Sequence, residues 1–394
     1  AGMRPAPLAR CLTAIACWAG SSGESPAWRQ LSPTGSAPSL VFHAAGMGGT
    51  DGEVLYVHGG CQGDGGYSPV DELWRYMFSA NTWSRTYPHG TTPGARWGHV
   101  AFVAQSGDSF YVHGGCTSDL PSTSSASDRL WRYTASTNSW QQVDSGGAKP
   151  SARCLHAATL SKIDSNVLWL HGGEKNSQQV GDLWMLTLST HAWEEVTPAG
   201  AKPAARSRHA VCASRADEGT LYIHGGLGGT GATMDDLWAF TVSSGRWRQM
   251  FPAGTSPSEL RHHVAFAPSA YSDVVFLHGG VNTGDTSQDR LWQLGSGTWQ
   301  QLEVGLVKPS SRYGHIRVSA GTVVYVHGGV AGSFRRRRRY TYAAAEADLW
   351  AVDLSNSAEV CAAGAFWSGS QCQPCPAGRF RAEGIAGADA ATAC

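Results

Sequence analysis

The chain has few charged residues and no net charge. Asp, Glu, Lys and Arg make up 15% of its 394 residues, and 30 basic side chains balance 30 acidic ones. Disordered chains combine low hydrophobicity with high net charge, so this composition argues against disorder. The balance also leaves no overall basic field of the kind that nucleic-acid-binding domains carry. We therefore predict a folded protein without a specific nucleic-acid partner.

Several sequence signals are missing. No run of 18 apolar residues occurs, so we expect membrane attachment only through a segment outside this chain. The catalytic patterns G-x-S-x-G and H-E-x-x-H and the Walker loop are absent. We therefore predict no catalytic residue, metal or cofactor, and a protein that is not an enzyme. No Asn-x-Ser/Thr glycosylation site occurs, which weakens the case for an extracellular location.

Glycine and tryptophan are abundant, with 49 and 16 copies, and this combination indicates short strands and tight turns. The tripeptide His-Gly-Gly (HGG) recurs six times after a β-branched, aliphatic or aromatic run, which is typical of a buried strand. The glycine pair permits backbone conformations and close approaches that a Cβ would forbid. The six copies begin at His58, His113, His171, His224, His278 and His327.

Three further landmarks recur in constant order around each HGG. A P-x-x-R-x-x-H segment comes before it in most units, with its His at His43, His99, His156, His209, His263 and His315. A Leu-Trp pair follows it and ends at Trp74, Trp131, Trp184, Trp238, Trp292 and Trp350. An acidic residue lies two or three residues before each of these Trp residues. A second Trp comes seven or nine residues later, at Trp83, Trp140, Trp193, Trp247 and Trp299.

The landmarks define four strands, a to d, in each unit of about 50 residues. This pattern resembles the kelch repeat over residues 27–356. The resemblance implies an all-β, six-bladed β-propeller, which we expect to be monomeric. No second Trp follows Trp350, while an unassigned WRQL segment begins at Trp28. We therefore predict that an N-terminal strand completes the sixth blade and closes the ring, which removes exposed sheet edges.

The repeated His and Trp residues have both a functional and a structural interpretation. Metal–nitrogen bonds are about 2 Å long, and a six-fold ring of that radius leaves no room for the inner strands. We therefore favour structural hydrogen bonds over metal binding for the repeated His. Most Trp side chains are expected to pack between blades. Trp97 and Trp169 lie outside the landmarks and are candidates for stacking on a sugar.

The repeated arginines are the main candidates for a binding face. In kelch propellers the d–a and b–c loops share one face, which commonly binds partners, and by this resemblance these arginines line the mouth of the channel. The alternative is that each binds backbone carbonyl groups of a neighbouring turn. The series is Arg96, Arg153, Arg206, Arg261 and Arg312.

The b–c loops vary in length, and variable loops on a rigid scaffold usually carry specificity. The sixth one contains five consecutive arginines: Arg335, Arg336, Arg337, Arg338 and Arg339. Such a run can contact a polyanion, act in nuclear import, or be a solvated insertion.

The cysteines are concentrated at the C-terminus. The candidates for disulfide bonds there are Cys361, Cys372, Cys375 and Cys394. Their pattern resembles the cysteine-rich ephrin-receptor-like repeats of extracellular proteins, and simple pairing would join Cys361 to Cys372 and Cys375 to Cys394. A segment this small needs such cross-links. Zinc binding is the alternative. Within the propeller, a Cys116–Cys154 disulfide between neighbouring blades competes with buried free thiols.

These observations define three segments. Residues 1–26 form a tail or a weak signal peptide, residues 27–356 the propeller, and residues 357–394 a cysteine-rich module that we expect to continue past Cys394. The leading hypothesis is a binding module that recognises a protein or glycan at one face of the propeller, in the extracellular or cell-surface part of a larger protein. The alternatives are an intracellular (cytoplasmic) kelch adaptor and an enzyme built on the propeller, because fold alone does not settle function.

Overall fold

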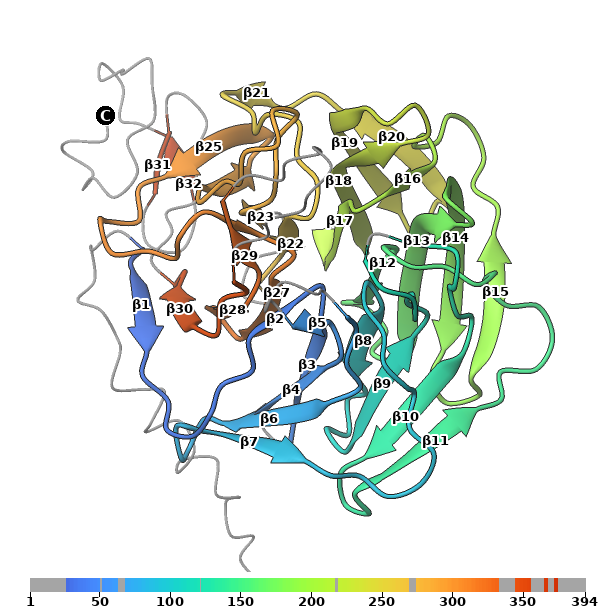
Figure 1. Cartoon of the computed structure of the whole chain (residues 1–394). Coiled ribbons are helices and arrows are strands. Elements are labelled where there is room, and N and C mark those ends of the chain that lie inside the picture. Colours follow the sequence, from blue (N-terminus) through green and yellow to red (C-terminus); the bar gives the residue numbers. More distant parts are fainter. Residues whose placement is uncertain are drawn as a thin grey trace, which may run out of the picture.

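Six sheets are arranged around a common axis in the computed structural model, each with four antiparallel strands, and two of them carry one additional short strand (Figure 1). The model describes residues 26–49, 52–62, 68–120, 122–216, 219–268, 274–332, 344–355, 365–367 and 372–374. The predicted all-β six-bladed propeller is therefore confirmed. No helix long and apolar enough to cross a membrane is found among these residues.

Each blade runs from an inner strand a to an outer strand d. Blade 1 consists of β3 (Ala44–Gly48), β4 (Val54–His58), β6 (Leu73–Met77) and β7 (Thr82–Thr86). Blade 2 consists of β8 (Val100–Val103), β9 (Ser109–His113), β10 (Leu130–Thr134) and β11 (Ser139–Val143). Blade 3 consists of β12 (Ala157–Leu160), β13 (Val167–Lys175), β14 (Gln178–Thr187) and β15 (Ala192–Val196).

The other three blades have the same order of strands. Blade 4 consists of β17 (Ala210–Ser214), β18 (Thr220–Gly228), β19 (Thr233–Thr241) and β20 (Arg246–Met250). Blade 5 consists of β22 (Val264–Phe266), β23 (Val275–His278), β24 (Leu291–Gly295) and β25 (Thr298–Leu302). Blade 6 consists of β27 (Ile316–Ala320), β28 (Val323–His327), β30 (Leu349–Asp353) and β1 (Trp28–Leu31). In blades 3 and 4 strand b continues through HGG, with a register shift at the glycine pair.

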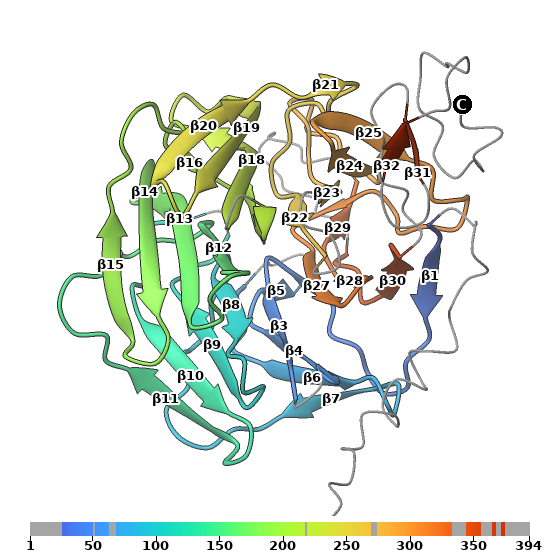
Figure 2. The same ribbon diagram turned by 180° about the vertical axis from the view of Figure 1, so that it is seen from behind.

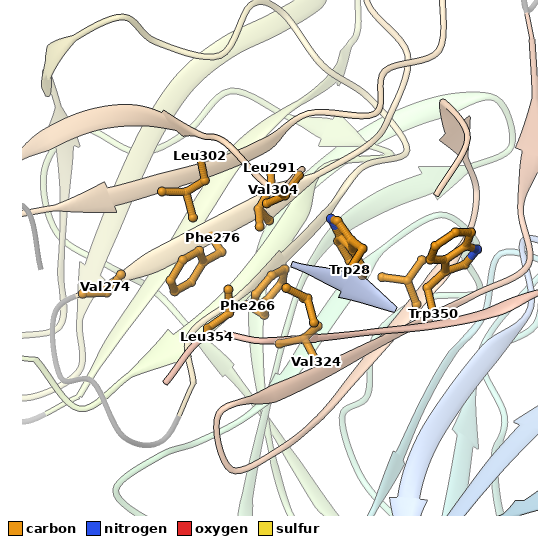
Figure 3. Packing of buried hydrophobic residues seen from close by; sticks show 12 residues of the cluster. Trp28, Phe266, Val274, Phe276, Leu291, Leu302, Val304, Val324, Trp350 and Leu354 are labelled. Carbon is orange, nitrogen blue, oxygen red and sulfur yellow. The ribbon is translucent and has the colours of Figure 1, made fainter. Parts of the chain in front are cut away.

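The N-terminal strand closes the ring, as predicted. β1 pairs antiparallel with β30, from Trp28 opposite Val352 to Leu31 opposite Leu349, and both views show the two strands side by side (Figures 1 and 2). Trp28 is buried in a cluster with residues of blades 5 and 6, among them Phe276 and Trp350 (Figure 3). Closure therefore joins the first and last strands of the propeller through both a hydrogen-bonded ladder and an apolar core.

The hydrophobic core lies between blades. Clusters of buried side chains join successive blades, as in the packing of Tyr56 from β4 with Val112 from β9 and Trp131 from β10. The glycine pairs permit close contact between blades: a Cβ on Gly172 would lie 2.6 Å from the carbonyl oxygen of Arg206 in the next blade. Gly172 has a φ of +64°, which also favours glycine.

A disulfide bond joins blades 2 and 3. Cys116 follows HGG in blade 2, Cys154 precedes β12 of blade 3, and their Cα atoms are 5.5 Å apart. At the equivalent contacts of other blades, apolar pairs such as Val281 and Tyr313 belong to the same buried cluster. The other two cysteines described in the propeller, Cys61 and Cys212, are buried free thiols.

Reduction of this disulfide should destabilise the propeller. The two cysteines are 38 residues apart, and closing a loop of that length stabilises a protein by about 4 kcal/mol in the chain-entropy model. We expect a reductant to lower the free energy of unfolding by about 2–4 kcal/mol, measured by urea denaturation. The double variant Cys116→Ala, Cys154→Ala should not respond to the reductant. An equal response of both proteins would contradict the prediction.

Candidate binding face

The d–a segments and the b–c loops lie on one face of the propeller. β2 (Leu40–Val41) pairs with β5 (Cys61–Gln62), and β26 (Arg312–Tyr313) with β29 (Val330–Ala331). In blade 4, β16 (Arg206–Ser207) pairs with the end of β18. Each pair joins the segment before strand a to the beginning of the b–c loop in the same blade. We call this side of the molecule the ring face, because of the arrangement described next.

Six residues form a closed ring of backbone hydrogen bonds on this face. One residue comes from each d–a segment, directly before the repeated His of strand a, and its N–H donates to the carbonyl oxygen of the ring residue in the preceding blade. The six N···O distances lie between 2.7 and 3.2 Å, and every φ lies between +56° and +64°. The ring residues are Phe42, Gly98, Leu155, Arg208, His262 and Gly314.

Glycine at two ring positions makes room for larger neighbours. A Cβ on Gly314 would lie 2.7 Å from a ring carbon of Phe42, and one on Gly98 would lie 3.1 Å from Leu155. The other four positions hold left-handed backbone with a side chain, which costs about 1–2 kcal/mol each. Backbone strain of this kind concentrates at functional sites.

Three ring side chains are half-buried at the centre of the face. The Phe42 ring lies 4.8 Å from His262 and 5.9 Å from Trp97, measured between centroids. Arg208 forms an ion pair with the buried Glu174 at 3.5 Å. Burial, followed by the charge of Arg208, holds the pKa of His262 well below its usual value. The centre of the ring face therefore presents aromatic rings and one guanidinium group.

The arginines predicted to line the channel mouth are buried. Arg153, Arg206 and Arg312 each form a bidentate ion pair with the acid of the Leu-Trp segment in their own blade: Asp182, Asp236 and Asp348. The side chains of all three arginines are at most 1% exposed. Each also donates to a carbonyl of its glycine pair, as Arg206 does to Gly225 at 2.9 Å. Contact of these arginines with an acidic partner stays a prediction.

The remaining two arginines of the series have different partners. Arg96 donates to the carbonyl oxygens of Pro93, Gly94 and Gly114. Arg261, which is shifted by one position in its segment, contacts Thr233, Asn282 and Asp285. Leu260 occupies the usual arginine position in that blade and is buried.

The position of the acid before Trp decides its partner. Where the acid lies two residues before the Trp, it accepts a hydrogen bond from that indole, as in Trp238 to Asp236 at 2.7 Å. Where it lies three residues before, it pairs with a surface lysine instead, as in Lys149–Asp128 at 3.1 Å and Lys308–Asp289 at 3.1 Å. A shift of one residue therefore moves the carboxylate from a buried network to a surface ion pair.

The twelve repeated histidines form a belt beneath the ring face. The HGG histidine of each blade shares a hydrogen bond of 3.0–3.3 Å with the strand-a histidine of the next. The indole of the second Trp in that next blade packs on the same HGG ring, as in Trp247 on His171 at 5.7 Å. These contacts agree with the structural interpretation. No group of three or more metal-ligating side chains occurs within the described part of the chain.

Burial keeps the belt neutral. It lowers the pKa of each HGG histidine to about 3 or 4, as for His58 and His224. Burial also holds the pKa of each strand-a histidine well below its usual value, with a further contribution from its HGG partner. A neutral imidazole can donate through one nitrogen and accept through the other, as each shared bond requires.

The two Trp residues considered for sugar stacking are buried in the fold. Trp97 is 1% exposed and donates its indole N–H to the carbonyl of Ser118 at 2.8 Å, while Trp169 is 5% exposed and packs on Phe240. The Arg335–Arg339 run lies outside the described residues, as do Cys361, Cys375 and Cys394. Cys372 begins β32 (Cys372–Pro374), which pairs with β31 (Ala365–Trp367).

Sequence reasoning missed the hydrogen-bonded ring. Its residues are Phe, Gly, Leu, Arg, His and Gly, which share no chemical type. The available signal was their constant place directly before the strand-a His, together with the two glycines.

Comparison with known proteins supports the repeat assignment. The family model "KLHDC2/KLHL20/DRC7 Kelch-repeats domain" matches residues 21–217 and 212–358. The chain is 26% identical over 305 residues to the Leucine-zipper-like transcriptional regulator 1 homolog of Drosophila melanogaster, and the match covers 74% of this chain and 30% of that protein.

Two further relatives match at similar identity. The human Kelch domain-containing protein 10 is 26% identical over 73% of this chain and 66% of its own length. The mouse Rab9 effector protein with kelch motifs is 26% identical over 49% of this chain and 52% of its own length. The matches thus cover between 30% and 66% of the length of these relatives. With six matching blades and a family model covering most of its length, the chain belongs to the kelch-repeat family.

Proposed function

We propose that this protein is a non-catalytic binding module that holds a protein partner on the ring face. The observation that carries the proposal is the closed hydrogen-bonded ring, which fixes Phe42, Arg208 and His262 at the centre of that face. Aromatic and arginine side chains held rigidly at the centre of a surface are typical anchors of protein interfaces. The b–c loops of different length surround them and supply specificity.

Relatives support a protein partner in general terms. The kelch propeller is a protein-interaction fold, and one relative is named as an effector of Rab9. A glycan has less support, because Trp97 and Trp169 are buried.

Substitutions on the ring face should disrupt partner binding. We expect Phe42→Ala and Arg208→Glu each to lower the affinity for a purified partner by about tenfold or more, because central anchors carry most of the binding energy. Candidate partners are those that crosslink to the wild-type protein in cells and are lost with both variants, identified by quantitative mass spectrometry. Arg248→Glu, on the exposed outer strand β20, is the matched control and should bind normally. Equal affinity of all four proteins would exclude the ring face.

We also propose that the protein acts as a monomer in an oxidising compartment, at the cell surface or outside the cell. Disulfide bonds persist in such compartments, and the Cys116–Cys154 bond supports this proposal. The ephrin-receptor-like pattern of Cys361, Cys372, Cys375 and Cys394 points the same way. The test is a count of free thiols by mass spectrometry on secreted and cytosolic material. Discrete pairing of the tail cysteines in folded secreted protein is the expected result, and reduced or zinc-bound cysteines would favour an intracellular adaptor.

A further inference from the structure

A channel of about 550 Å³ runs between the inner strands of the six blades. The strands around it are β3, β8, β12, β17, β22 and β27 (Figures 1 and 2). Much of its wall is made of small apolar side chains, including Ala44, Ala101, Ala157, Ala210 and Ala265. The volume falls within the range of small-molecule binding sites.

Two positive charges stand in this channel without a negative partner among the described residues. Arg317 lies on β27 of blade 6, and Lys162 follows β12 of blade 3. Both side chains are half-buried, and neither forms an ion pair with any described residue. The described residues that line the channel include no Asp or Glu.

The surroundings of both side chains disfavour their charged forms. Burial lowers the pKa of Lys162, and the charge of Arg317 lowers it further. Burial also lowers the pKa of Arg317. The thiol of Cys212 lies near both, but burial raises its pKa to about 12, so it is neutral and cannot balance them. This contrasts with Arg153, Arg206 and Arg312, each of which has its own carboxylate.

Unpaired charges in a partly dehydrated site are costly, and an anion removes that cost. Low-dielectric walls also focus the field of such charges and attract ligands of opposite sign. Hydroxyl groups of Ser161 and Ser319 line the same channel and can donate further hydrogen bonds.

We propose that the channel binds a small organic anion, with its carboxylate or phosphate held between Arg317 and Lys162 and its apolar part against the alanine-rich wall. This site is separate from the ring face and needs no protein partner.

Isothermal titration calorimetry with simple probes tests the proposal. Phenyl phosphate and benzoate carry the two candidate head groups on the same apolar body, and phenol is the neutral control. We expect one or both anions, but not phenol, to bind the wild-type protein and raise its thermal unfolding midpoint. Arg317→Gln and Lys162→Gln should each lower the affinity for the anion by about tenfold or more, because each removes a charged hydrogen-bond donor. Arg248→Gln, on the exposed outer strand, should bind as the wild type does.

Two results would overturn the proposal. One is the absence of binding by either anion, or equal binding to the wild type and both channel variants. The other comes from stability without ligand. Because neither cation has an acidic partner among the described residues, we expect both channel variants to unfold at or above the wild-type midpoint. A clear loss of stability in either variant would mean that an internal carboxylate already neutralises the cation.

Discussion

Acidification should unfold this propeller cooperatively between about pH 6.5 and pH 5. The twelve belt histidines have their pKa lowered by burial in the folded protein, to about 3 or 4 for the HGG members, whereas a histidine in the unfolded chain has a pKa near 6.5. Below that pH the unfolded state binds more protons, so stability is complete above about pH 6.5 and is lost as the pH falls towards the folded values.

The expected effect is large because twelve sites act together. Each contributes up to about 1.4 kcal/mol per pH unit once the unfolded state is protonated. Twelve such sites give roughly 16 kcal/mol per pH unit, which exceeds the total stability of about 5–15 kcal/mol of a typical domain.

Tryptophan fluorescence and near-ultraviolet circular dichroism across pH measure this transition. The variant His113→Gln, His156→Gln removes one belt pair and should make the transition less steep in pH. His89→Gln, at an exposed position outside the belt, should leave the steepness unchanged. A protein that stays folded at pH 4.5 would show that the belt accepts protons in the native state.

Replacement of one buried arginine should cost far more stability than removal of an equivalent surface lysine. Arg206→Met leaves Asp236 with one side-chain hydrogen-bond donor among the described residues, the indole of Trp238. Burial alone would raise the pKa of Asp236, and the hydrogen bond and charge of Arg206 are what hold it below its usual value. We expect a loss of about 3–5 kcal/mol in the free energy of unfolding, because one partner of a buried pair remains uncompensated.

Lys149→Met is the matched control. Asp128 holds the corresponding acid position in blade 2, but Lys149 is 45% exposed and its acid 36% exposed. Exposed pairs contribute about 0–1 kcal/mol, so this variant should unfold in urea almost as the wild type does. The double variant Arg206→Met, Asp236→Asn should recover part of the loss. Equal costs for Arg206→Met and Lys149→Met would refute the distinction between the two networks.

The fold was predictable because its determinants are local and repeated. Each unit has its own HGG and Leu-Trp, the first five also have a second Trp, and these mark strands b, c and d wherever they occur. Ring closure followed from a count alone, since the sixth unit lacked a strand that a segment at Trp28 could supply. Sequence periodicity records strands and their number, because a missing or extra strand breaks the pattern.

The contacts of the candidate sites depend on neighbours that the sequence does not place. The arginine series looks uniform in sequence, yet its members bind different partners because the acid before Trp moves by one residue and because Arg261 is displaced. The hydrogen-bonded ring depends on six residues of different type, and His327 meets His43 across 284 positions. The channel cations Lys162 and Arg317 come from different blades. The sequence by itself determined the number of blades, their strands and the closure. Only the tertiary structure decided which charges pair with one another and which side chains the ring holds, because these depend on distances between residues far apart in the chain.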